Sequence, residues 1–389
     1  MKILILGFGK SGQSAYKLLS EYDVDLYVYD QKKIQGVNYL SYDDLKKSLP
    51  LFDLCIRSPG VNRKSKEYWL SYNLSKKMIS ELELGLYFLK TKYIVAVTGT
   101  NGKTTTCKMI DALLSVKYKT HLVGNIGVPL TSLVKLIKED DIVIMELSSY
   151  MLEDTFSLHP YISIITSLDE NHQEGNLNLE TYYSSKKRIL FNCQNVIFSN
   201  DDINKKISFI PRKFENKYQV KKHFSLTNTI NFKTSLEVCH LFNLTNEEVN
   251  KGIKKIKIDK YRQEVINKGN IIFVNDSKST SSEATNQCIE EFKDYEIIII
   301  LEGIFKGINI DKIRFSKVKK VYSYGKISSL LPSFVLKRNS LEEILEEIKL
   351  LKKDHLCVIF SPAGSSFDLY ENYIKRGEHF EFLVNNLWK

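Results

Sequence analysis

The chain of 389 residues is 43% hydrophobic and 26% charged, which predicts two or three globular domains with a full apolar core in each. Its formal net charge is +10, but the basic residues are spread along the chain and form no block that resembles a nucleic-acid-binding tail. We therefore expect an ordinary lysine-rich surface and no nucleic-acid partner. The alternative is an overall positive field that attracts anionic ligands.

The six cysteines are widely separated, and none forms the closely spaced pair typical of a metal site. Reduced thiols in a cytoplasm fit this pattern better than a disulfide framework. The longest aliphatic run, residues 297–301, is far too short to span a bilayer, and the apolar start of the chain leads into a glycine loop rather than a cleavage site. These features predict a cytoplasmic protein without a signal peptide or a membrane partner. We expect it to act as a monomer.

The first part of the chain carries a glycine loop between a strand and a helix. An apolar strand pattern at residues 2–6 leads into Gly-Phe-Gly-Lys-Ser-Gly at 7–12, and the next strand pattern ends at Asp30. This loop, with an acid about twenty residues further on, is typical of a dinucleotide-binding unit, although any ligand with a diphosphate and a ribose suits it. A later strand pattern leads into a Ser-Pro-Gly turn that begins at Ser58, which is either a ligand-binding turn at the sheet edge or a plain turn.

Residues 98–105, Thr-Gly-Thr-Asn-Gly-Lys-Thr-Thr, are the most informative stretch of the chain. They follow an apolar strand pattern at 94–97 and precede the apolar spacing of a helix at 107–114. In such a loop the glycines let backbone amides approach phosphates, Lys103 neutralises their charge and Thr104 offers its hydroxyl to Mg²⁺. The alternative is a glycine turn that happens to precede a lysine. The order strand, loop, helix favours a site for ATP or a related nucleotide.

Polar residues also follow the next strand patterns of the middle part. The pattern at 142–145 ends at Glu146, where a carboxylate beside the phosphate loop is placed to hold Mg²⁺, directly or through water. A plain surface or ion-paired carboxylate is the alternative. The pattern at 162–166 leads toward His172, and Lys186 follows on a predicted helix. A lone histidine and a pair of lysines are usually structural, but these follow three other strand ends of the ligand-binding type.

Three strand patterns of the last part, at 271–274, 297–301 and 357–360, each lead into a polar cluster. The helical spacing between them, as at 340–351, predicts a parallel sheet with right-handed crossovers. Because the carboxyl ends of parallel strands meet at one edge, we expect the lysines, hydroxyls and aspartate of these clusters to converge there. Such an edge suits an anionic ligand.

The order of these motifs resembles that of the Mur ligase family, essentially from end to end. The resemblance rests on the glycine loops, the Ser-Pro-Gly and Gly-Asn-Ile-Gly segments and the polar strand ends, at residues 7–12, 58–60, 98–105, 124–127, 146–149, 172, 186, 275–278 and 361–368. The phosphate loop alone also fits a folylpolyglutamate synthase, but the diphosphate-type N-terminal part argues against that family.

The resemblance implies an α/β fold of three domains: an N-terminal Rossmann-like domain, a central P-loop-type ATPase sheet and a C-terminal Rossmann-like domain. The expected boundaries are 1–90 for the uridine-diphosphate substrate, 91–258 for ATP and 259–389 for the amino acid.

The resemblance also implies an ATP-dependent acid–amino-acid ligase of peptidoglycan precursor synthesis, with UDP-N-acetylmuramoyl-L-alanine and D-glutamate as substrates. A carboxylate is a poor electrophile, so ATP would convert it into an acyl phosphate that the amine of D-glutamate attacks. ATP and two Mg²⁺ ions are the expected cofactors.

The residues that the resemblance assigns form four groups. The catalytic group is Lys103, Glu146, His172 and Lys186. The metal ligands are Thr104, Glu146, His172 and a carbamylated Lys186. The ATP contacts are Gly99, Thr100, Asn101, Gly102, Lys103, Thr104, Thr105, Asn231, Arg262 and Asp276. The substrate contacts are Gly12, Asp30, Ser58, Asn125, Ser148, Lys278, Thr280, Lys306, Ser366 and Phe367.

Three positions depart from the family pattern. Asn171 replaces an aspartate, Ile230 a histidine and Glu302 a glycine, and the last of these places a like charge near an anionic substrate. Other interpretations therefore stay open: another Mur-type or folylpolyglutamate-type ligase, a non-catalytic nucleotide-binding relative, and a nicotinamide oxidoreductase, which would explain the N-terminal loop alone. Release of ADP that requires both an acyl substrate and an amino acid separates them.

Overall fold

The structure is a computed structural model, and it describes residues 1–47, 51–168, 179–200, 203–204, 218, 226–257, 260–304, 312–351 and 355–388. The chain divides by its internal contacts into two compact units, each described by itself. Unit 1 comprises Met1–Lys222 and Ile230–Lys257, and unit 2 comprises His223–Thr229 and Ile258–Lys389. Unit 1 contains two separate sheets and unit 2 contains one. The fold is α/β, as expected, while the domain boundaries at 90/91 and 258/259 stay predictions.

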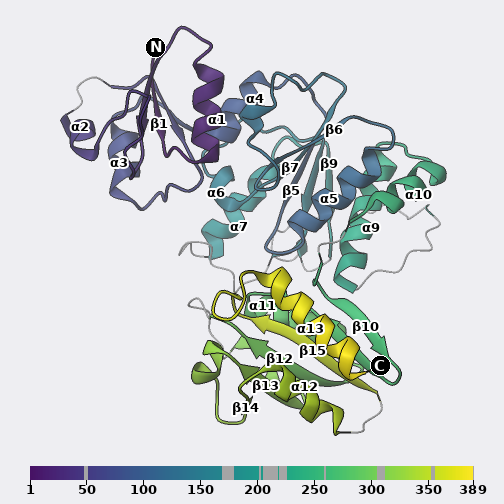
Figure 1. The fold of residues 1–389 in the computed structure, drawn as a ribbon. Helices are drawn as coiled ribbons and strands as arrows, with labels where there is room; N and C mark the ends of the chain where they lie inside the picture. The colour runs from purple at the N-terminus through teal and green to yellow at the C-terminus, as the bar shows by residue number, and fades with distance from the viewer. Residues whose placement is uncertain are drawn as a thin grey trace. The chain divides into compact units, whose positions relative to one another are not determined.

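The first sheet of unit 1 has four parallel strands in the order β2-β1-β3-β4. Its elements are β1 (Lys2–Leu6), α1 (Lys10–Leu19), β2 (Asp25–Tyr29), α2 (Tyr42–Lys47), β3 (Leu54–Arg57), α3 (Lys66–Asn73), β4 (Met78–Ser80) and α4 (Glu81–Phe88). Figure 1 labels its central strand β1, with the helices α1, α2 and α3 beside it. The central strand β1 is apolar from Ile3 to Leu6 because both of its faces are covered: Leu4 and Leu6 belong to one core cluster and Ile3 to another. The loop after β1 therefore starts from a rigid strand end.

The second sheet of unit 1 has five parallel strands in the order β6-β7-β5-β8-β9. Its elements are β5 (Ile94–Thr98), α5 (Lys103–Leu114), β6 (Thr120–Gly124), β7 (Ile142–Glu146), α6 (Ser149–Leu152), β8 (Ile162–Ile165), α7 (Leu179–Lys187), β9 (Asn195–Phe198), α9 (Leu226–Leu241) and α10 (Asn246–Lys255). The strand that leads into the phosphate loop, β5, is central and fully buried. Its neighbours β7 and β8 end beside that loop.

A buried ion-pair network connects the two sheets of unit 1. Arg57, the last residue of β3, is fully buried and pairs with Asp154 and, at 3.2 Å, with Glu153, both just beyond α6. Its guanidinium also donates to the carbonyl of Val61 at 2.9 Å and to that of Tyr150 at 2.7 Å. Every side of this cation is therefore paired, as a buried charge requires.

Unit 2 is a six-stranded sheet in the order β10-β11-β15-β12-β13-β14, parallel except for β10. Its elements are β10 (Glu264–Lys268), β11 (Ile271–Asn275), α11 (Ser282–Glu291), β12 (Glu296–Glu302), β13 (Lys320–Tyr324), β14 (Leu336–Lys337), α12 (Leu341–Lys349), β15 (Leu356–Ala363) and α13 (Tyr373–Leu387). Along β12, Ile297 and Ile299 pack with α11 residues on one face, and Ile298 and Ile300 pack with α12 and α13 residues on the other. The carboxyl ends of β11, β15 and β12 consequently lie at one edge.

All six cysteines are free, and five of them are buried, as expected for reduced thiols. In the ranges that the structure describes, no helix combines the length and the apolar character that crossing a bilayer requires.

Candidate active site

The phosphate loop of unit 1 is confined by the end of the neighbouring strand β8. Gly99 has a φ of +148°, and a Cβ atom there would lie 2.1 Å from Oγ1 of Thr166. Gly102 has a φ of +85°, a left-handed conformation that favours glycine. Both glycines are thus required by the backbone and not only by a ligand.

The same strand end holds the loop by hydrogen bonds. Ser167 accepts at its carbonyl from the amide of Thr100 at 2.9 Å and at Oγ from the amide of Asn101 at 2.8 Å. Thr166 donates to the carbonyl of Asn101 through its hydroxyl. The sequence patterns did not single out Thr166 and Ser167 as loop-binding residues. Their position at the end of a predicted strand could have indicated this role.

The structure places Lys103, Thr104 and Glu146 close together at the phosphate loop, while their roles stay predictions. Nζ of Lys103 donates to the carbonyls of Gly99 and Thr100, at 2.7 and 2.9 Å, so the ammonium lies over the loop. The hydroxyl of Thr104 donates to Oε2 of Glu146 at 2.8 Å. Glu146 ends β7 and is 1% exposed. The first turn of α5 and the end of β7 therefore bring these groups to one place.

Asn125, directly after β6, connects Glu146 to the loop that follows that strand. Its side-chain amide donates to Oε1 of Glu146 at 2.9 Å. Among the described ranges no group of three or more His, Cys, Asp or Glu side chains is arranged so that it could hold a metal ion. A hydroxyl and a carboxylate nevertheless fit Mg²⁺, which prefers oxygen ligands and usually keeps several waters and phosphate oxygens in its shell.

Lys186, near the end of α7, is fully buried, and its Nζ donates to the carbonyl of Gly99 at 3.1 Å. It therefore does not lie on a solvated helix face, the structural alternative for this residue. His172 and Asn171 lie outside the described residues, so the expected pairing of His172 with Lys186 stays a prediction.

Ser148, a predicted substrate contact, caps the short helix α6: its hydroxyl oxygen accepts a hydrogen bond from the amide of Met151.

Asn231, on α9, packs against the loop from the other side. It is 3% exposed, and its Oδ1 accepts from the hydroxyl of Thr106 at 3.3 Å. A Cβ atom on Gly102 would lie 2.8 Å from this Oδ1. Its Nδ2 is buried and has no hydrogen-bond acceptor among the described residues. Because an unmet buried donor costs free energy, this nitrogen suits a contact to a bound nucleotide.

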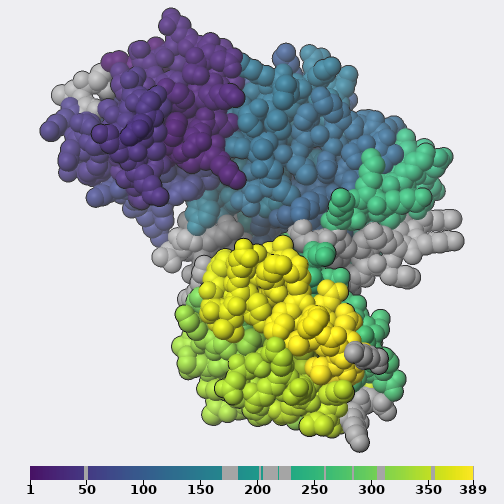
Figure 2. All heavy atoms as spheres, viewed as in Figure 1, coloured from purple at the N-terminus to yellow at the C-terminus, as the bar shows by residue number. Residues whose placement is uncertain are grey.

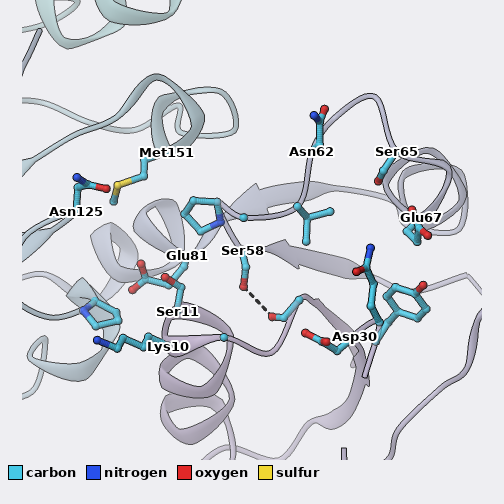
Figure 3. Close-up of a pocket in the computed structure, with 18 of the residues that line it drawn as sticks. Lys10, Ser11, Asp30, Ser58, Asn62, Ser65, Glu67, Glu81, Asn125 and Met151 are labelled. Atoms are coloured by element: carbon cyan, nitrogen blue, oxygen red, sulfur yellow. Dashed lines mark hydrogen bonds between the residues drawn. The ribbon is translucent and has the colours of Figure 1, made fainter. Parts of the chain in front are cut away.

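A cavity of about 580 Å³ opens between the first and second sheets of unit 1. Figure 3 shows Asp30 and Ser58 of the first sheet on one part of its wall and Asn125 and Met151 of the second on another. The carboxylate of Asp30 accepts from the amides of Phe8 at 2.7 Å and Lys32 at 3.0 Å, which fixes it at the mouth of the glycine loop.

Two predicted substrate residues also shape the glycine loop itself. The hydroxyl of Ser58 donates to the carbonyl of Gly7 at 2.7 Å, a contact drawn in Figure 3. Gly12 does not line the cavity; a Cβ atom there would lie 2.0 Å from the carbonyl oxygen of Gly7. The structure thus gives Gly12 a packing role, and its part in substrate binding stays a prediction.

In unit 2, Asp276 is almost fully buried, with both oxygens engaged. Oδ2 accepts from the hydroxyls of Ser279 at 2.6 Å and Ser361 at 2.8 Å, and Oδ1 accepts from the amide of Gln263 at 3.2 Å. Burial raises the pKa of this carboxyl to about 6, while the nearby Arg262 opposes the shift. A ribose contact from Asp276, as predicted, would have to share these internal hydrogen bonds.

The remaining predicted residues of unit 2 follow three strand ends. Lys278 follows β11, and its Nζ lies 5.8 Å from the ring centre of Tyr373. Ser366 and Phe367 follow β15, with Ser366 buried and Phe367 66% exposed. Thr280 is exposed, and Lys306 lies outside the described residues.

Glu302 corrects one interpretation of the sequence. Its carboxyl group is fully buried at the end of β12 and pairs with the guanidinium of Arg376 on α13. A glutamate at this position therefore does not present a bare negative charge to an anionic substrate. No sequence pattern had singled out Arg376.

The raised pKa of Asp276 predicts how stability changes with pH. The folded chain keeps this proton up to a pH of about 6, whereas the unfolded chain releases it near the ordinary value of 3.8. Folding thus takes up a proton between these values, and stability falls as pH rises through that window. We expect Asp276→Asn to weaken this fall in the urea midpoint, followed by fluorescence of Trp388 in unit 2. The exposed Asp294→Asn serves as the control, and a slope in Asp276→Asn equal to that of the control would contradict the expectation.

Comparison with known proteins extends the resemblance. Residues 97–272 match the family model of the Mur ligase middle domain. The UDP-N-acetylmuramoylalanine–D-glutamate ligase of Pseudothermotoga lettingae is 30% identical over 80% of this chain and 80% of that protein. The ligase of the same name from Caldicellulosiruptor saccharolyticus is 28% identical over 99% of both.

Solved structures show the same fold. The MurF ligase from Thermotoga maritima, in complex with ADP, aligns with a TM-score of 0.58 and 14% identity over 99% of this chain and 94% of that one. A pseudomurein peptide ligase type C from Methanothermus fervidus aligns with a TM-score of 0.53 and 15% identity over 99% of both. At these identities the likeness concerns the fold alone.

The glycine loop between β5 and α5, with the strand-end carboxylate beside it, defines a P-loop nucleotide-binding protein with doubly wound sheets. Together with the comparisons this is specific: the chain belongs to the Mur ligase family. It is an enzyme, an ATP-dependent ligase that forms an amide bond between an acid and an amino acid.

Proposed function

We propose that this ligase adds D-glutamate to UDP-N-acetylmuramoyl-L-alanine, in cytoplasmic synthesis of peptidoglycan precursors. The observation that carries the proposal is the position of Asn125, which lines the cavity between the two sheets and donates to Glu146 beside the phosphate loop. An acceptor held in the cavity would thus bring its free carboxylate next to the γ-phosphate of ATP. Relatives that match almost end to end carry the name of this reaction.

Phosphoryl transfer to a carboxylate requires neutralisation of the negative charges, and the acyl phosphate that forms must be protected from water. The carboxylate of the acceptor takes the γ-phosphoryl group of ATP and becomes an acyl phosphate. The amine of D-glutamate then attacks the carbonyl carbon, and the amide forms as phosphate leaves. Mg²⁺, with two ions proposed, would offset the negative charge on the phosphates. Lys103 would neutralise the transferring group, while Thr104 and Glu146 would orient the ion.

Roles for the other residues follow from their positions. Asp30, Ser58 and the glycine loop would hold the uridine-diphosphate part in the cavity. Asn231, whose buried Nδ2 has no acceptor within the described part of the chain, would contact ATP, as would Arg262 and Asp276. Lys278, Thr280, Lys306, Ser366 and Phe367 would bind the carboxylates of D-glutamate.

The test is ADP release by the full chain with ATP, Mg²⁺, UDP-N-acetylmuramoyl-L-alanine and a panel of L- and D-amino acids. The proposal expects release that needs both the acceptor and D-glutamate. Release with a different amino acid or acceptor would indicate another Mur-type or folylpolyglutamate-type ligase. Nucleotide binding without release under every combination would indicate a non-catalytic relative.

The carboxylate of Glu146 should set the Mg²⁺ requirement. Because it is hydrogen-bonded to Thr104 at the end of β7, Glu146→Ala removes the anionic oxygen nearest the loop hydroxyl. We expect the half-saturating Mg²⁺ concentration to rise at least about tenfold, or turnover to stop. Glu139→Ala, at an exposed carboxylate before the same strand, should titrate like the wild type. Identical Mg²⁺ curves for Glu146→Ala and the wild type would argue against the role.

A further inference from the structure

One buried guanidinium in unit 2 contacts the segments that follow three strands. Although α13 forms part of the visible surface of unit 2 (Figure 2), Arg376 in its first turn is fully buried. Its Nε donates to Oγ of Ser277 at 3.0 Å and its Nη2 to the carbonyl of Ser277 at 2.7 Å. Its Nη1 donates to the carbonyl of Gly364 at 3.0 Å and to Oε2 of Glu302. One side chain thus fixes the ends of β11, β15 and β12.

Each of these contacts lies within four positions in the sequence of a residue proposed to bind the amino acid. Ser277 directly precedes Lys278, and Gly364 lies two positions before Ser366. Glu302 is the last residue of β12, four positions before Lys306.

The segments after β12 and β15 are also tied to each other. Ile304 and Ser365 exchange two backbone hydrogen bonds, at 2.8 and 3.0 Å. A Cβ atom on Gly303 would lie 2.4 Å from the carbonyl oxygen of Ser365, and one on Gly364 would lie 2.7 Å from that of Glu302. With the backbones this close, a shift of Glu302 displaces the segment that carries Ser366.

The second oxygen of Glu302 faces another carboxyl group. Oε1 of Glu302 and Oδ1 of Asp368 are both buried and lack a separate donor among the described residues, and the two side chains interact. A proton shared between them satisfies both oxygens. Oδ2 of Asp368 accepts from the amide of Lys326 at 3.0 Å, which fixes its orientation.

The groups around Glu302 favour its protonated form at neutral pH. Burial raises the pKa of Glu302 to about 8, with Asp368 adding to the shift and Arg376 opposing it. Tyr324 at the end of β13 and Tyr370 also interact with it. Burial raises the pKa of both phenols above its ordinary value, so they stay neutral.

We propose that Glu302 is a positioning residue for the amino-acid substrate, which acts with Arg376 and Asp368 to hold the segments after β11, β12 and β15 in their binding arrangement. The substrate part of this proposal rests on the proposed function. The hydrogen-bonded cluster itself can be tested without turnover.

The first test is amide hydrogen exchange of the full chain. Glu302→Ala leaves Arg376 without its carboxylate, so exchange at Ile304 and Ser365 should become at least about tenfold faster. Glu302→Gln should retain their protection, because its amide oxygen accepts from Arg376 and its amide nitrogen donates to Asp368. Glu296→Gln, at the other end of β12, is the control. If the amides of Ile304 and Ser365 exchange at the wild-type rate in Glu302→Ala, while the amides of unit 1 show that the chain is folded, the proposal is overturned.

The second test compares the effect of the substitution on the KM for D-glutamate with its effect on the KM for another substrate. Glu302→Ala should raise the KM for D-glutamate between about tenfold and a hundredfold, since small displacements of binding groups are costly. The KM for UDP-N-acetylmuramoyl-L-alanine, whose proposed contacts lie in unit 1, should stay within about twofold, which a general loss of structure would not allow. An equal rise in both constants would overturn the positioning role.

The pH dependence provides a test that needs no disruptive variant. As pH rises through about 8, ionised Glu302 and Asp368 repel each other, so the wild-type KM for D-glutamate should rise more steeply than that of Glu302→Gln. Parallel profiles would contradict the shared proton. A wild-type chain that does not use D-glutamate overturns the proposed function, whereas the exchange experiment still decides whether Glu302 holds these segments.

Discussion

Lys103→Ala is expected to lower the rate of ADP release at least about a hundredfold, the scale of one lost electrostatic stabiliser in a transition state. Nζ of Lys103 lies over the phosphate loop, held by the carbonyls of Gly99 and Thr100. A phosphate that enters the loop would exchange these weak neutral acceptors for charged ones. The alanine variant keeps the backbone amides of the loop. It loses the one positively charged side chain in the first turn of α5. The measurement is the initial rate of ADP release at saturating substrates.

The control for this variant is Lys108→Ala, which removes a lysine further along the same helix α5. It should release ADP at close to the wild-type rate. The thermal unfolding midpoints of both variants show whether either change acts through stability. Near-normal release by Lys103→Ala would refute the assignment of the phosphate loop.

Lys186→Ala should lose most of its activity, by at least about a hundredfold, while Lys187→Ala should not. Lys186 is fully buried beside the loop, and its neighbour Lys187 is half-buried. A free ammonium beside bound cations would be repelled, whereas the neutral amine is the form that reacts with CO₂. Carbamylation would convert Lys186 into an anionic oxygen ligand for Mg²⁺.

Carbon-13 NMR tests the modification separately from turnover. With ¹³C-bicarbonate, the wild type and Lys187→Ala should show a carbamate resonance that Lys186→Ala lacks. An active wild-type enzyme without such a resonance would exclude carbamylation. Full activity of Lys186→Ala would exclude any catalytic role of this lysine.

The sequence predicts the central strands well because they are buried on both faces. The strands β1, β5, β7, β12 and β15 can each be predicted from their own apolar residues, without knowing which strands they pair with. Edge strands lack that signal: β10 (Glu264–Lys268) carries two charged ends and is largely exposed, so its pattern resembles a loop. Its pairing with β11 comes from tertiary structure.

The candidate site divides in the same way. Lys103, Thr104 and Glu146 occur where glycine loops and strand ends mark them, and the structure brings them together. Arg376 has no such mark, since its partners Ser277 and Glu302 lie 99 and 74 residues away in sequence. Nothing local distinguishes a buried arginine on an amphipathic helix from an exposed one. Only the fold shows which charges are neutralised.

The arginine at the end of β3 limits how this chain can be recombined with its relatives. A chimera that takes its first sheet from another protein must supply a cation at Arg57, or Glu153 and Asp154 lose the buried guanidinium that pairs with both of them. Removing one partner of a buried pair costs about 3–5 kcal/mol, a large share of the stability of a domain. The first and second sheets are therefore expected to be exchanged together, as one module whose halves have been matched to each other.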